Sequence, residues 1–133
     1  KICHKIDKFL FTHAGVSPEF MDEQFLQDWD INNIDEKLND LFEYKPSAFN
    51  FYGFNPYGDN TFQTPIWIRP RSLMKSNKDK IIHQNLIQIV GHTKVNEIDI
   101  KGKATGGKYF FIDSLHNKEY LIISDGIISK GKL

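Results

Sequence analysis

Residues 9–18 read FLFTHAGVSP, and this stretch decides how the rest of the chain is interpreted. The apolar run of residues 9–11 predicts a buried strand that stops at a loop around His13. Ser17 predicts the start of a helix, because serine is a favoured N-cap and Pro18 suits the first helical position. The stretch therefore predicts a strand, a loop that carries a histidine, and a helix in direct succession.

Residues 86–93, LIQIVGHT, place a second histidine in the same kind of context. A β-branched run predicts a buried strand, and it ends at Gly91-His92-Thr93. Side chains at the carboxyl end of a central strand face the crevice where α/β folds bind ligands. Small neighbours leave room for a metal ion or a phosphate, and imidazole is the commonest protein ligand for transition metals. A hydrogen-bonded structural role for either histidine stays open.

The remaining pattern predicts helices first and strands afterwards. A second helix is expected to open at Asn33 and to end at Pro46, with Ile34, Leu38, Leu41 and Phe42 on one face. Residues 72–84 suggest helix plus loop. Short strands are expected at 98–101, 109–112 and 120–123, and Asp125-Gly126 predicts a hairpin turn into 127–129. This order favours an α+β fold or a mixed sheet.

Composition limits the classes of function. A chain of 133 residues predicts a single domain over 1–133. Basic and acidic residues number 17 each, which argues against general nucleic-acid binding and membrane-surface binding, since both rely on a basic excess. No apolar run approaches the roughly 20 residues of a membrane span. Cys3 is the only cysteine, so no internal disulfide forms, and we expect a cytoplasmic location.

Residues 47–64 are dense in aromatic residues, asparagine and glycine and show no helical or strand period. They predict an ordered loop or a broken helix. In one interpretation the loop borders a substrate site, where Tyr52 and Tyr57 stack on a base or contact a phosphopeptide. In the other interpretation its rings pack onto the helices and form a satellite core.

Four blocks in order carry a resemblance to a known family. They are 11–18 (FTHAGVSP), 66–69 (IWIR), 90–93 (VGHT), and 112–114 (IDS) with 119–122 (EYLI). Taken together they resemble the calcineurin-like metallophosphoesterases, in the branch of the serine/threonine protein phosphatases and diadenosine tetraphosphatases. Lys94 stands where other branches of that family carry a further histidine.

The resemblance implies the C-terminal half of a metallophosphoesterase β-sandwich flanked by helices. His13 and His92 would ligate the same metal of a two-metal centre of Mn, Fe or Zn. Arg69 would be the catalytic residue that contacts the substrate phosphate, with Arg71 as the alternative. In the family the other metal-binding blocks precede the His-Ala-Gly block, and only 12 residues precede His13 here. We therefore expect the full-length parent protein to be a hydrolase that uses a metal-activated water. We expect the 133-residue chain on its own to be inactive.

The expected substrate is a phosphorylated protein or a nucleotide. Self-association is also expected as an option, because a strand at residues 9–11 without its neighbours would expose an edge. A non-catalytic binding or scaffold protein that retains the fold is the alternative from another functional class. An unrelated α+β domain with a chance match is the third.

Overall fold

A central four-stranded sheet organises the computed structural model, which describes residues 1–51, 53, 60–76 and 85–133. Its strands are β1 (Cys3–Ile6), β2 (Phe9–Thr12), β3 (Ile87–Val90) and β4 (Tyr109–Phe111), in the order β1-β2-β3-β4. Strand β1 is antiparallel to β2, whereas β2, β3 and β4 run parallel. The carboxyl ends of the three parallel strands consequently meet at one edge of the sheet.

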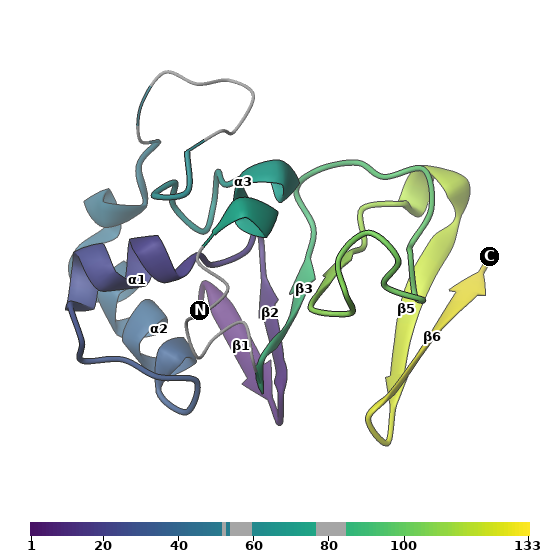
Figure 1. The fold of residues 1–133 in the computed structure, drawn as a ribbon, viewed down its shortest axis with the longest axis horizontal. Helices are drawn as coiled ribbons and strands as arrows, with labels where there is room; N and C mark the ends of the chain where they lie inside the picture. Colours follow the sequence, from purple (N-terminus) through teal and green to yellow (C-terminus); the bar gives the residue numbers. More distant parts are fainter. Residues whose placement is uncertain (52, 54–59, 77–84) are drawn as a thin grey trace.

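Helices lie on one side of this sheet, as Figure 1 shows, and a separate hairpin lies on the other. The helices are α1 (Pro18–Phe25), α2 (Ile34–Tyr44) and α3 (Pro70–Lys75), with 3₁₀ turns η1 (Pro46–Phe49) and η2 (Leu115–Asn117). The hairpin consists of β5 (Glu119–Ser124) and β6 (Ile127–Lys132). None of the helices within the described ranges has the length and apolarity that crossing a membrane requires.

Local signals explain where these elements begin. The Ser17 side chain accepts a hydrogen bond from the backbone N–H of Phe20 at 3.1 Å, and Pro18 occupies the first turn of α1. The predicted start of α1 is thus confirmed. Asp125 and Gly126 both have positive φ, 50° and 76°, as a two-residue hairpin turn requires.

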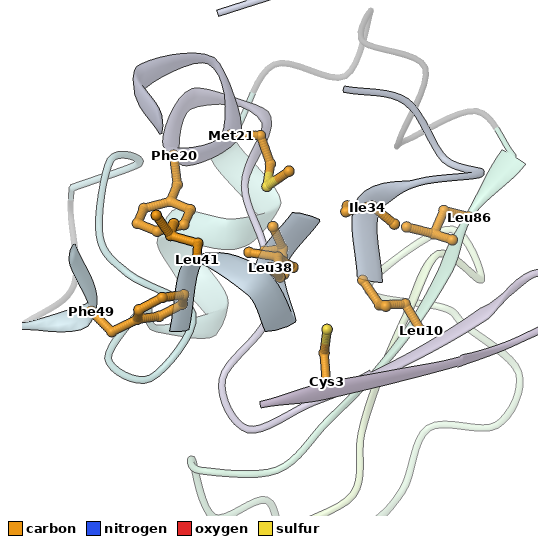
Figure 2. Close-up of a cluster of buried hydrophobic side chains, with 10 residues drawn as sticks. Cys3, Leu10, Phe20, Met21, Ile34, Leu38, Leu41, Phe49 and Leu86 are labelled. Atoms are coloured by element: carbon orange, nitrogen blue, oxygen red, sulfur yellow. The ribbon is translucent and has the colours of Figure 1, made fainter. Parts of the chain in front are cut away.

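The main core lies between the sheet and helices α1 and α2. Figure 2 shows Cys3 and Leu10 pointing from β1 and β2 toward apolar side chains of both helices. The apolar face predicted for α2 is confirmed at three positions, because Ile34, Leu38 and Leu41 are at most 2% exposed. The fourth predicted position, Phe42, is partly exposed at the edge of this core. The other buried members are Val16, Phe20, Met21, Phe49 and Leu86.

The opposite face of the sheet packs against the hairpin. Phe9, Ile89 and Phe110 are buried there, and partly buried side chains pack on them. Those side chains come from the sheet, from the position directly after β4 and from the hairpin: Phe11, Ile87, Ile112, Leu121, Ile123 and Ile128. The hairpin therefore covers the sheet face that the helices leave free.

The observed architecture corrects the predicted fold class. The expected α+β half of a β-sandwich is replaced by an α/β arrangement whose central sheet is mostly parallel. The physical reason is that strands β2 and β3 are joined by a long, helix-containing crossover, which delivers β3 parallel to β2. Antiparallel pairing occurs between β1 and β2 and within the β5–β6 hairpin, which the turn at Asp125-Gly126 predicted.

One predicted strand is absent from the structure, and one observed strand was not predicted. The strand expected at 98–101 does not form, since those residues make turns in which Ile98 is buried and its N–H donates to Glu119. Strand β1 was not predicted, because its sequence CHKI is mostly polar and only Cys3 is fully buried. Its strand conformation depends on pairing with β2.

Candidate functional site

The two predicted histidines meet at the carboxyl ends of β2 and β3. These strands are parallel, with Thr12 paired to Val90, so the loops that follow them leave the sheet side by side. The N–H of Gly91 donates to the backbone oxygen of His13 at 3.0 Å. In addition, Nδ1 of His92 lies 2.9 Å from Nε2 of His13, a hydrogen-bond distance.

The hydrogen bond between the rings restricts their protonation. One of the two facing nitrogens must carry the shared proton while the other accepts it. The two rings therefore cannot be imidazolium cations at the same time in this arrangement, because two N–H groups would then face each other. One of them can be. The pair can hold one extra proton and release it, which is the property that acid–base chemistry needs.

A strained turn places His92. The N–H of Thr93 donates to the oxygen of Gly91 at 2.7 Å, and His92 between them has φ 64°. This is a γ-turn with positive φ at its centre, a form that is rare and strained for residues with a side chain. The turn reverses the chain directly after β3 and directs the imidazole toward His13.

Electrostatics keep His92 neutral. Burial lowers the pKa of its imidazole below the ordinary value, and the positive charge of Arg69 and the neighbouring His13 lower it further. The carboxylate of Asp113 acts in the opposite direction. At neutral pH the lowered pKa makes His92 an uncharged hydrogen-bonding group and a proton acceptor.

Arg69 approaches the same turn from the segment before α3. Its Nη1 donates to Oγ1 of Thr93 at 3.3 Å. The segment is tied to the first histidine loop, because the N–H of Ala14 donates to the oxygen of Pro65 at 2.9 Å. Arg69 is half-buried. One guanidinium and two imidazoles are thereby gathered at one edge of the sheet.

Two exposed aromatic rings flank this cluster. Trp67 meets the His92 ring edge-on, with 6.2 Å between centroids, and Phe51 meets Trp67 at 5.9 Å. The Trp67 side chain is 41% exposed and that of Phe51 is 48% exposed. They form an aromatic wall that leads from the surface to the histidine pair.

A buried glutamine fixes the first histidine loop. Gln88 in β3 is 1% exposed, and its amide makes two hydrogen bonds with the backbone of Val16, both 2.8 Å long. Oε1 accepts from the Val16 N–H, and Nε2 donates to the Val16 oxygen. Because Val16 follows His13 by three residues, this side chain holds the loop against β3.

Polar atoms without partners mark both loops. Oγ1 of Thr12 and Nε2 of His92 are buried and have no hydrogen-bond partner within the described part of the chain. An unpaired buried polar group costs about 1–3 kcal/mol. Native structures keep few of these groups, and a catalytic role, strain or a bound water or ion explains those that remain. Both atoms lie at the carboxyl ends of β2 and β3, where the histidines meet.

The other predicted site residues have different outcomes. Arg71 lies exposed in the first turn of α3, whereas Arg69 contacts the turn that carries His92. Tyr52 and Tyr57 lie outside the described residues. Sequence reasoning did not single out Thr93 or Gln88. A polar glutamine inside an otherwise apolar strand was the available signal for Gln88.

Comparisons with known proteins give a fold likeness. A solved structure described as a cold-active protein-tyrosine phosphatase of a psychrophilic Shewanella species matches with a TM-score of 0.60 and 18% identity. A point mutant of a cold-active protein tyrosine phosphatase matches with a TM-score of 0.59 and 21% identity. Each match covers 98% of this chain and 40% of the solved chain. No family model and no curated protein matches the sequence.

This likeness overturns the resemblance inferred from the sequence blocks. The predicted calcineurin-like metallophosphoesterase of the serine/threonine branch was wrong, because the solved structures with this fold are described as protein-tyrosine phosphatases. Short blocks such as His-Ala-Gly and Gly-His-Thr occur wherever a buried strand ends in a loop of small residues. Their order alone did not identify the branch.

The predicted two-metal cofactor, with Mn, Fe or Zn, is corrected at the same time. Within the described ranges, no three or more histidine, cysteine, aspartate or glutamate side chains group so as to hold a metal ion. His13 and His92 instead direct ring nitrogens at each other. The structure thus shows His13 and His92 as a hydrogen-bonded imidazole pair near Arg69, in place of the predicted ligands of a manganese, iron or zinc ion.

Proposed function

We propose that this chain carries the phosphate-binding and proton-transfer residues of a phosphoester hydrolase that acts on phosphorylated proteins. The observation that supports the proposal most is the meeting of His13, His92 and Arg69 at the carboxyl ends of parallel strands. The described function of the structural neighbours supports the phosphate ester and the protein substrate. The chain spans 40% of their length, so the proposal concerns the whole protein.

Arg69 is the proposed phosphate ligand. A guanidinium presents several N–H donors in one plane and remains charged at every physiological pH. Nη1 uses a donor for Thr93, and the fork has further donors for phosphoryl oxygens. A bound phosphate also offsets the arginine charge, which favours protonation of the nearby His92.

His13 is the proposed acid–base residue, because it is exposed while His92 lies deeper. In hydrolysis, a water oxygen forms a bond to phosphorus as the bond to the leaving oxygen breaks. The proton released by the water is accepted by the imidazole pair, and the leaving oxygen receives a proton in return. The hydrogen bond to His92 orients the His13 ring for this exchange.

Cys3 does not supply a nucleophile in this scheme. Its side chain is 5% exposed in the main core, and burial raises the pKa of its thiol to about 12, with Asp35 raising it further. Its Sγ donates to the oxygen of Asp35 at 3.6 Å. At neutral pH the group is a protonated, buried thiol, whereas attack on phosphorus requires an accessible thiolate.

Arginine variants of the full-length protein test this proposal. Arg69→Ala should raise the KM for a phosphopeptide and the inhibition constant of inorganic phosphate by at least about 10-fold, as expected for loss of a charged phosphate contact. Arg71→Ala is the matched comparison, and its effect should be several-fold smaller. Equal effects would shift the phosphate role to α3. A wild-type protein that binds phosphopeptide without turnover would favour the non-catalytic binding function.

A further inference from the structure

Thr93 holds the arginine of the site with a neutral acceptor. Its Oγ1 accepts from Nη1 of Arg69 at 3.3 Å. A carboxylate at this position would orient the guanidinium but would also cancel most of its charge. A hydroxyl orients the group and leaves the positive charge in place for an anion. That charge still acts on His92, whose pKa it lowers.

The backbone of Arg69 is fixed, but its side chain needs a further contact. Arg69 directly precedes α3, and its backbone oxygen accepts from the N–H of Leu73 at 2.9 Å. The long side chain nevertheless carries roughly 2 kcal/mol of rotamer entropy when it is free. A hydrogen bond at the guanidinium end removes much of that freedom before substrate arrives.

The strained turn joins Thr93 to the histidine pair. Thr93 is the last residue of the γ-turn, and its N–H bonds to Gly91 on the other side of His92. The central residue of the turn therefore directs its imidazole to His13, and the next residue directs a hydroxyl to Arg69. A movement of the turn would therefore shift the imidazole together with the hydroxyl that holds the guanidinium.

We infer that Thr93 is a positioning residue, which orients Arg69 for phosphate and couples the guanidinium to the His13–His92 pair. The inference rests on the proposed function, because it assumes that Arg69 binds phosphate.

The test uses the full-length protein with p-nitrophenyl phosphate as substrate and inorganic phosphate as inhibitor. Thr93→Val keeps the side-chain shape and removes the acceptor, so KM and the phosphate inhibition constant should rise roughly 5- to 10-fold with a smaller change in kcat. Thr93→Ser retains the hydroxyl and should stay within about 2-fold of wild type. Thr105→Val is the matched control, since Thr105 bonds to the oxygen of Tyr109 in a turn outside the site.

A double-mutant cycle separates positioning from a general structural effect. In an Arg69→Ala background, Thr93→Val should change KM and phosphate inhibition by less than about 2-fold, because the group that it orients is gone. Additive effects would overturn the inference, as would a Thr93→Val variant that matches Thr93→Ser. Thr93→Ala replaces the valine variant if the latter does not fold. A wild-type protein without turnover or phosphate inhibition would overturn the proposed function itself.

Discussion

Gln88→Leu should destabilise the fold by several times the effect of an ordinary surface substitution. The side chain is 1% exposed, and Val16, its partner, is fully buried. Leucine has a similar size but forms neither of the two 2.8 Å hydrogen bonds. The variant would therefore bury the N–H and the carbonyl of Val16 without partners.

The size of the effect follows from those two groups. Each orphaned backbone group costs about 1–3 kcal/mol. The apolar leucine side chain returns roughly 1–2 kcal/mol through burial. The two groups together cost about 2–6 kcal/mol, so the net loss is centred on about 2.5 kcal/mol, which for a domain of this size lowers the melting temperature by roughly 10 °C.

Urea denaturation followed by circular dichroism measures this loss as a change in the free energy of unfolding. Gln27→Leu is the control, because Gln27 is exposed after α1 and its replacement should change stability by less than about 0.5 kcal/mol. A Gln88→Leu loss below about 1 kcal/mol would refute the reasoning. It would mean that the loop after His13 is held by other contacts.

Three further predictions concern the backbone, the titration and the thiol. Gly15→Ala should lower the free energy of unfolding, measured by urea denaturation, by about 2–4 kcal/mol. Gly15 has φ 107°, and an added Cβ would lie 2.4 Å from Leu73 Cδ2. Unchanged stability would show that α3 can shift. The pKa of His92 is lowered by folding, so the unfolded chain binds more protons between that lowered pKa and about 6.5. Stability should be complete above this window and fall as the pH drops through it, and His92→Asn, which tolerates positive φ, should flatten the slope. Cys3→Ala should retain phosphatase activity in the full-length protein. The native Cys3 thiol should resist iodoacetamide until the protein unfolds, and rapid alkylation of the folded protein would contradict a thiol pKa of about 12.

Sequence patterns predicted the local elements of the site well. The strand that ends at Thr12, the cap at Ser17 and the strand that ends at Val90 all depend on neighbouring residues, so a short window contains their signals. The same windows singled out His13 and His92, which the structure brings into contact. Arg69 was singled out through the family resemblance, as a phosphate contact, and in the structure it contacts Thr93 beside His92.

Pairing between distant segments was beyond these patterns. A short apolar run does not specify whether its partner is parallel or antiparallel, and the parallel pairing of β2 with β3 depends on the crossover between them. The mostly polar β1 becomes a strand through its pairing with β2. The chemistry was mistaken for a related reason, since a histidine after a strand can bind a metal or another histidine. The 2.9 Å contact between the rings appears once the two loops are placed together.

Phosphate release from phosphopeptides is the measurement that tests the proposed function most directly. The full-length protein should hydrolyse the peptides, and His13→Ala should reduce kcat/KM by at least about 100-fold, as expected for loss of an acid–base group. The variant should keep its fold, because His13 is exposed. Turnover within about 3-fold of wild type in His13→Ala would contradict the proposed role of the histidine pair, and an inert wild-type protein would contradict the hydrolase itself.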